Sequence, residues 1–305
     1  YGKTLSWFSS ENIRYGTVIA IVTGLLFIHR QLTIEGRPFV DFTLLKNKYS
    51  LLAHLFSIFM MFFVSMGILT SGYVNSVLRI GTTRYNELYL RMIPGIIMGG
   101  IISYILYRRQ VRMAWQIFLG FFCFGVCLSL SYFTMASYGT YEDLLLPLFF
   151  RGVGMCLLFV AFSVYSVKNL ERPQYIRNAF YIVSVRSTIA PVIGYSILSN
   201  WLYYAQIKHT NILSASVDTQ NPLAMSLYTS SLHRYLADGL SIEEAKSMAN
   251  YALYSRVQIQ ALTVSVKEIL GYMLIFCILI LIVILLYFFR FAPVRYIETG
   301  KDMTE

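Results

Sequence analysis

The sequence predicts an all-α integral membrane protein, and three observations lead to this prediction. The run from Ile269 to Phe289 holds twenty-one residues without a charge, enough to cross a hydrocarbon core of about 30 Å at about 1.5 Å per residue. Hydrophobic residues make up 57% of the chain and charged residues only 13%, whereas soluble domains are nearer a quarter charged. Further apolar runs of membrane-spanning length recur along the chain.

Seven apolar runs, each bounded by charges or turn residues, are expected to be membrane-spanning helices. They cover residues 13–29, 50–78, 86–107, 114–135, 144–168, 176–203 and 266–290. We expect residues 1–49 to form a single span followed by a cytoplasmic linker. Residues 50–305 are expected to form a six-helix bundle with an external helical segment at about 204–265.

The spans differ in character along the chain. The helices at 114–135 and 266–290 carry no interior charge and are suited to face lipid. The helices at 86–107, 144–168 and 176–203 each contain one arginine in the interior and one proline, and proline permits bends in membrane helices. These prolines are Pro94, Pro147 and Pro191.

Small residues and cysteines are interpreted as packing features. Gly95 and Gly99 form a small-xxx-small pattern, which is typical of close helix contacts in membranes. All four cysteines lie in apolar segments without a neighbouring histidine or acid, so we predict neither a disulfide framework nor a metal site. No cofactor is expected. The cysteines are Cys123, Cys127, Cys156 and Cys277.

The loop charges predict the orientation of the chain. Alternate loops and the C-terminal tail hold thirteen of the 25 Lys and Arg, whereas the loops at 79–86 and 136–143 hold only Arg79 and Arg84. The positive-inside rule therefore predicts a cytoplasmic C-terminus and an external N-terminus. The same loops account for the net charge of +10 without nucleic acid. One external span before six others favours a fragment of a longer protein. The basic loops are at 29–50, 108–112 and 168–177.

The external segment at 204–265 is predicted to be helical. Asn221-Pro222 begins a helix that Asp238-Gly239 ends, and Ser241 to Glu244 fits a capping box that starts a second helix running towards the last span. We favour an amphipathic hairpin lying on the membrane surface. The alternative is a docking surface or a lid.

Polar side chains inside the spans are the candidates for a substrate cavity. An arginine within a span costs at least about 2.5–3.5 kcal/mol, so it usually faces a wet cavity or a partner. Arg186 is expected near mid-membrane, where a buried link to helix-end carbonyls or to an acid on another helix is the alternative to a cavity or gating role. For Arg151, structural and functional roles are both open, and Arg91 is close enough to the external end to reach headgroups. The cavity candidates are Arg186, Arg151, His54, Arg91, Met61 and Asn75. For His54 and the methionines, ordinary packing is the alternative.

Four sequence motifs resemble one transporter family. The segment Arg37-Pro-Phe-Val-Asp-Phe-Thr-Leu-Leu-Lys-Asn-Lys-Tyr49 resembles the loop before the C-terminal bundle of EmrB/QacA-type transporters, which are fourteen-helix members of the major facilitator superfamily. Arg151-Gly-Val-Gly154 resembles the arginine–glycine helix of that family. Arg186, with Pro191 and Gly194, and the pair Gln260-Ala261 resemble two further family features.

The resemblance implies proton-coupled efflux of amphipathic drugs or toxic small molecules through the cell (inner) membrane. It implies a bundle whose first, second, fourth and fifth helices line a central cavity. In a Gram-negative host, a periplasmic adaptor and an outer-membrane channel would be the partners. Two other functions stay open: transport of an anionic metabolite, and a seven-helix receptor or scaffold. A membrane enzyme is not expected, because no HExxH, GxSxG or GxxxxGK[ST] motif occurs.

Overall fold

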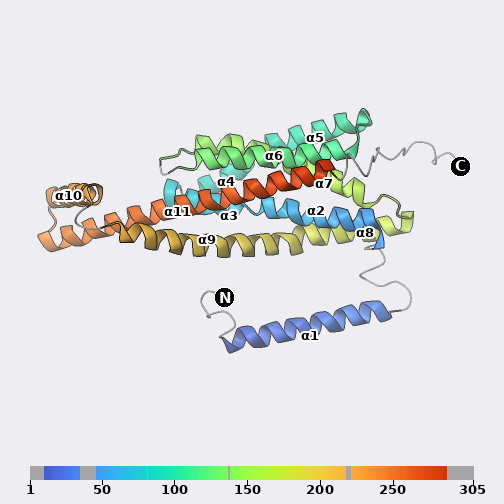
Figure 1. Cartoon of the computed structure of the whole chain (residues 1–305), viewed down its shortest axis with the longest axis horizontal. Coiled ribbons are helices and arrows are strands. Elements are labelled where there is room, and N and C mark those ends of the chain that lie inside the picture. The colour runs from blue at the N-terminus through green and yellow to red at the C-terminus, as the bar shows by residue number, and fades with distance from the viewer. Residues whose placement is uncertain (1–9, 35–45, 81, 137, 218–220, 287–305) are drawn as a thin grey trace.

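The computed structural model is all-α and contains seven helical segments long and apolar enough to cross a membrane (Figure 1). It describes residues 10–34, 46–80, 82–136, 138–217 and 221–286, and in these ranges there is no strand. The prediction of an all-α integral membrane protein is confirmed. The first segment, α1 (Glu11–Thr33), lies apart from the others, and its most apolar window is 0% buried.

The remaining helices form a bundle and a long projection. In chain order they are α2 (Lys48–Val64), α3 (Gly67–Tyr73), the π-helix η3 (Val74–Leu78), α4 (Thr82–Leu90), α5 (Ile93–Arg108), α6 (Met113–Thr134), the short 3-10 helix η4 (Glu142–Leu144), α7 (Leu145–Ser166), α8 (Arg172–Ser184), the π-helix η5 (Val185–Ile189), α9 (Ala190–Ala215), α10 (Pro222–Ala237) and α11 (Ile242–Ile284).

Two predicted spans are interrupted. The span at 50–78 was predicted as one helix, but α2 ends at Val64 and α3 begins at Gly67. The Ser65 hydroxyl donates to the Met61 carbonyl at 2.8 Å, a local bond that competes with the helical ladder. The span at 86–107 breaks between α4 and α5, where Pro94 occupies the first turn of the new helix and brings no backbone N–H.

The centre of the bundle is α7, which packs against α2, α5 and α6. A cluster of buried phenylalanines fills the space between α2, α6 and α7. The ring centroids of Phe63 lie 6.1 Å from Phe121 and 5.8 Å from Phe124, and those of Phe121 and Phe162 lie 6.3 Å apart. Aromatic rings at these separations contribute packing beyond the area they bury.

Glycines let the backbone of α7 touch those of its neighbours. A methyl group on Gly95 would overlap the Phe149 carbonyl oxygen, and one on Gly152 would lie 2.5 Å from the Met92 carbonyl oxygen. On another side of α7, a methyl group on Gly154 would lie 2.8 Å from the Gly120 carbonyl oxygen. The helix contact predicted from the small residues at Gly95 and Gly99 is therefore confirmed.

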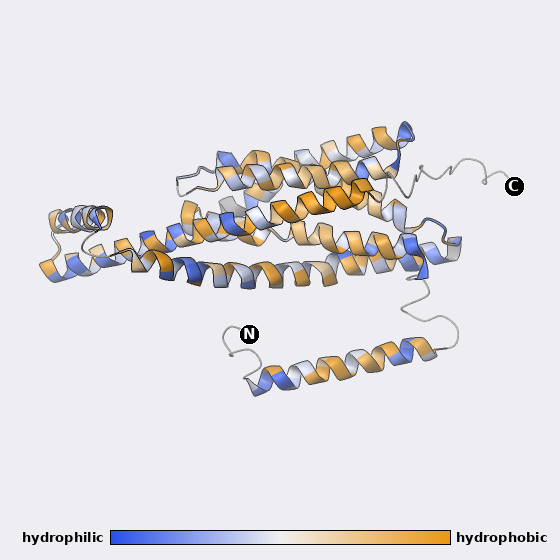
Figure 2. Ribbon diagram, viewed as in Figure 1, coloured by the Kyte–Doolittle hydropathy of each residue, from blue (hydrophilic) through white to orange (hydrophobic). Residues whose placement is uncertain are grey.

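The segment predicted to be external, at about 204–265, begins and ends as straight continuations of α9 and α11. α9 runs unbroken to Ala215 and α11 starts at Ile242, so both helices extend well past the bundle and α10 crosses their tip (Figure 1). α11 has 43 residues, or about 64 Å, twice the thickness of a hydrocarbon core. Its outer half is markedly more polar than its inner half (Figure 2). No proline or glycine interrupts α9 after Gly194 or α11 before Gly271, so neither helix turns where it leaves the bundle, and the surface hairpin stays a prediction.

The predicted start of α11 is confirmed. The Ser241 hydroxyl accepts from the Glu244 amide, and the Glu244 carboxylate accepts from the Ser241 amide at 3.1 Å. This capping box satisfies backbone groups that the first helical turn leaves unpaired. Asn221 likewise caps α10, accepting from the amide of Leu223 at 3.1 Å.

Gly95→Ala is expected to lower the stability of the bundle, because α5 must move away from the Phe149 carbonyl. Overpacking of this kind costs about 1–3 kcal/mol. Gly100→Ala is the matched control, since its new methyl group would meet only Cys156 Sγ at 3.9 Å. Thermal unfolding in detergent should show a lower midpoint for Gly95→Ala alone. Equal midpoints for the two variants would contradict the close α5–α7 contact.

Candidate functional site

Arg186 lies on the π-helix η5 with its side chain half-buried. The guanidinium carbon is 4.3 Å from the centre of the Phe159 ring on α7, a cation–π contact. The neighbouring Ser163 is exposed, so α7 and η5 share an open face at this level. Twelve residues separate Arg186 from Gln174, where this candidate span begins, a rise of about 18 Å. Arg186 therefore lies well inside the span, a little under a third of the way along its 42 residues.

The π-helical turn at Arg186 follows from Pro191. A proline disrupts the α-helical hydrogen bonds of the turn that precedes it, because the proline has no N–H and because its ring crowds the carbonyl four residues earlier. Here the Ala190 amide reaches back five residues to the Val185 carbonyl, which widens the helix. π-helical turns of this kind are frequent at functional sites. The sequence analysis noted the proline but did not predict the π-helix.

Arg151 occupies the interior of the bundle and is 3% exposed. Its Nη2 donates to the Val64 carbonyl at 2.5 Å, and its guanidinium lies 5.9 Å from the Tyr89 ring centre. Gly67, the first residue of α3, gives it room, because a methyl group there would lie 3.1 Å from Nη2. Arg151 therefore links α7 to the break between α2 and α3.

The Val64 carbonyl is available to Arg151 because the helix breaks there. In an unbroken helix it would accept from the Ile68 amide, but that amide donates to the Ser65 carbonyl at 3.1 Å. A buried carbonyl without a donor is costly, particularly in a membrane. A charge-assisted bond from an arginine satisfies it.

His54 belongs to a buried polar network that joins α2, α7 and α8. Its Nδ1 lies 2.5 Å from the Ser50 carbonyl oxygen. The Ser50 hydroxyl donates to Asn178 Oδ1 at 2.9 Å, and Asn178 Nδ2 donates to the Ser166 hydroxyl oxygen at 2.8 Å. The His54 ring also packs edge-on against Tyr181, with centroids 6.0 Å apart. His54 is thus embedded in helix packing.

The other three predicted site residues lie in separate places. Met61 is buried at 8% exposure in the core. Asn75 is exposed on η3, and Arg91 is exposed in the turn between α4 and α5. Among the residues that the structure describes, no hydrogen bond, ion pair or ring contact joins any two of the six candidates. They do not form one cluster within this bundle.

The sequence analysis missed an apolar cavity of about 450 Å³ between α2, α9 and α11. This volume is in the range of pockets that hold drug-sized molecules. One indication was present in the sequence, since Phe59 and Phe62, and likewise Tyr272 and Phe276, are spaced to share a helix face. The cavity is lined by Ile58, Phe59, Phe62, Ala190, Ile193, Gly194, Ile197, Trp201, Tyr272, Met273 and Phe276.

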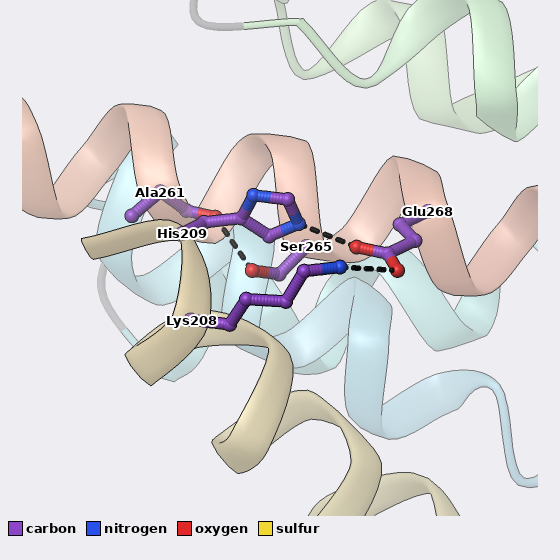
Figure 3. Close-up of polar contacts among 5 residues, drawn as sticks. All are labelled: Lys208, His209, Ala261, Ser265 and Glu268. Atoms are coloured by element: carbon purple, nitrogen blue, oxygen red, sulfur yellow. Dashed lines mark hydrogen bonds and ion pairs between the residues drawn. The ribbon is translucent and has the colours of Figure 1, made fainter. Parts of the chain in front are cut away.

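A small ion cluster ties α9 to α11 between this cavity and α10. Figure 3 shows Lys208 and His209 of α9 pointing toward Glu268 of α11. Lys208 Nζ lies 3.2 Å from Glu268 Oε1, and His209 Nε2 contacts Oε2. Lys208 is largely exposed, so its ion pair contributes little, whereas the half-shielded histidine–carboxylate contact holds the helix pair more firmly.

Comparison with known proteins identifies relatives over most of the chain, although no family model matches it. The multidrug export protein EmrB of Escherichia coli strain K12 is 25% identical over 271 residues, covering 88% of this chain and 50% of EmrB. The probable multidrug resistance protein EmrY of the same strain is 23% identical over 228 residues, covering 73% of this chain and 43% of EmrY. The chain is similar in sequence to these two Escherichia coli proteins.

This relationship confirms the resemblance to the EmrB/QacA family drawn from the sequence. The chain spans about half the length of the EmrB and EmrY proteins that it matches. Together with the seven apolar helices, the EmrB relationship supports a multi-pass membrane protein.

Arg151→Met is expected to destabilise the bundle by about 1–3 kcal/mol, because the Val64 carbonyl loses its donor in a buried environment. Arg186→Met should have a much smaller effect, since that side chain is half-exposed and only its contact with Phe159 is lost. Thermal unfolding of the two variants in the same detergent makes the comparison. A more stable Arg151→Met variant would mean that desolvation of the guanidinium outweighs its bond to α2.

Proposed function

We propose that this chain is part of a secondary active transporter that exports amphipathic drugs or toxic small molecules. The observation that carries the proposal is its similarity, over 73–88% of the chain, to two bacterial proteins named for multidrug export and resistance. Export function is a property of those relatives, and the geometry of this chain is compatible with it. A proton is the proposed coupling ion, as the family resemblance implies.

The apolar cavity supports the substrate class. Its aromatic and aliphatic lining suits the apolar part of an amphipathic compound, which gains by leaving water or lipid headgroups. Phe59, Phe62, Trp201 and Phe276 offer ring faces without a fixed set of polar groups, and such a surface accepts varied shapes. We propose that substrates contact this wall on their way through the membrane.

Arg186 is proposed to act on the open face of the bundle. A half-exposed guanidinium near mid-membrane is costly unless it meets water, an anion or a moving partner. The π-helical turn beneath it is a weak point in the helix where the backbone can adjust. We therefore assign Arg186 a gating or substrate-contact role, and Arg151 the structural link described above. His54, Arg91, Met61 and Asn75 are retained as secondary candidates.

The orientation and setting are part of the same proposal. The basic loops predict a cytoplasmic C-terminus and an external N-terminus in the cell (inner) membrane, which places the α9–α11 projection outside. In a Gram-negative host the projection would face the periplasm, where an adaptor leading to an outer-membrane channel would act. The named export functions of the relatives do not favour a receptor, a scaffold or an anionic-metabolite carrier.

Arg186→Ala is expected to abolish efflux without preventing membrane insertion. The complete gene is expressed in an efflux-deficient host, and dye retention is compared with that of wild type and empty vector. Retention should rise to the empty-vector level in Arg186→Ala and stay low in Arg14→Ala, which removes an exposed arginine of α1. Wild-type retention equal to empty vector would reject drug export. Low retention in Arg186→Ala would reject only the role of that residue.

Ile193→Trp should obstruct the apolar cavity, which it lines from α9. The larger side chain fills part of the cavity and leaves less room for bulky substrates. The apparent affinity of the transporter for these substrates should therefore fall by about tenfold. Ile212→Trp, an exposed position on the same helix outside the cavity, is the matched control. Concentration-dependent efflux of a bulky and a small dye measures the difference. Equal behaviour of both variants would exclude the cavity from the substrate route.

A further inference from the structure

A second large pocket lies at the external end of the bundle and is strongly basic. It has a volume of about 620 Å³ and is enclosed by the chain just after η3, by α10 and by α11. Its walls include Arg79, Arg234 and Arg256, with Ser230, Ser255 and Tyr251 among them. We call this the basic pocket. Neither the apolar cavity nor the arginines inside the spans belong to it.

The three arginines come from three different parts of the chain and line one pocket without a counter-charge among its described residues. Arg79 follows η3, Arg234 lies on α10 and Arg256 lies on α11. None of the described residues that line the pocket is acidic, and no ion pair to these arginines is found in the described ranges. Like charges repel, so an arrangement that gathers three of them is stabilised by an anion.

The backbone at Arg79 is held in an unusual conformation that aims its side chain at the pocket. Its φ of 51° and ψ of 35° are in the left-handed region, which is uncommon for residues other than glycine and asparagine. Arg79 Nη2 donates to the Ser255 hydroxyl of α11 at 3.1 Å. That bond uses one guanidinium nitrogen and connects the end of the first bundle span to the projection.

The position of the pocket is at the predicted external boundary of the membrane. Val77 and Arg79 are at the end of the candidate span Lys48–Leu78. The pocket residues of α11 precede Glu268 by about two and a half to nearly five helical turns, on the polar outer half of that helix. Both a lipid headgroup and a dissolved anion can reach such a place.

We propose that the basic pocket binds a phosphate-bearing group. Planar guanidinium groups make paired hydrogen bonds to phosphate oxygens, and serine and tyrosine hydroxyls add further donors. Three arginines around one volume match a group with several anionic oxygens better than a single carboxylate. The phosphate group belongs either to an anionic lipid headgroup of the outer leaflet or to a dissolved phosphorylated compound.

Isothermal titration of the complete protein in an uncharged detergent tests the proposal. The titrants are inorganic phosphate, glycerol phosphate, dihexanoyl phosphatidylglycerol, and dihexanoyl phosphatidylcholine as the zwitterionic comparison. Arg79→Asn removes the charge while placing a residue that tolerates the left-handed backbone, so its melting temperature should not fall. Lys246→Gln removes an equal charge from α11 at an exposed position that does not line the pocket.

We expect the wild-type protein to bind at least one of the phosphate titrants. Arg79→Asn should raise the dissociation constant by about tenfold or more, because one charge-assisted hydrogen bond to the phosphate is lost. Lys246→Gln should leave the dissociation constant within about twofold. Binding of inorganic phosphate or glycerol phosphate identifies a dissolved ligand, and binding of phosphatidylglycerol alone identifies a lipid. Equal binding of phosphatidylcholine, equal effects of the two variants, or no binding would overturn the proposal. Dye efflux is not the readout, so this result is independent of the export function.

Discussion

The hydrogen bond from Arg151 to the Val64 carbonyl is the interaction on which the bundle depends. It allows the first bundle helix to break inside an apolar environment without leaving a backbone acceptor unsatisfied. The residues beside Arg151 also position neighbouring helices. Gly152 allows α7 to pack closely against α5, and Gly154 allows it to pack closely against α6. Four consecutive residues of α7 therefore set the positions of three neighbouring helices. The arginine–glycine motif that carried the family resemblance has a physical basis in this geometry.

The two deep arginines show how burial separates structural from functional charge. Arg151 has a fixed acceptor for Nη2, a neighbouring ring and 3% exposure, so its side chain is held inside the bundle, while its Nε and Nη1 have no hydrogen-bond partner among the described residues. Arg186 is half-exposed and rests on a π-helical turn, with a ring contact and no hydrogen bond among the described residues. A charge that the protein leaves this weakly held is free to respond to a ligand or to a change of conformation. For this reason we assign the proposed transport role to Arg186.

Much of the fold could be predicted from the sequence, because hydrophobic length and capping residues are local signals. The seven spans and the capping box at Ser241 are examples. The break at Ser65 could not be predicted, because the group that satisfies the freed Val64 carbonyl is Arg151 of α7, which is distant in sequence. For the same reason the sequence left the role of Arg151 open. The straight projection of α9 and α11 was not predicted, because amphipathic character alone does not tell a helix on a membrane surface from one that continues a span.

α11 connects the two pockets physically. From Ile242 to Ile284 it is one α-helix without proline and with a single glycine, Gly271, so it behaves as a stiff rod. Tyr272 and Met273 line the apolar cavity, Glu268 holds α9, and Arg256 lines the basic pocket. If α11 shifts along its axis, the residues that it contributes to both pockets must therefore shift together. The contact between His209 and Glu268, which ties α11 to α9, opposes such a shift. In a bundle proposed to change conformation during export, an anion held by Arg79 and Arg256 would bind the first bundle span to this rod and oppose their separation.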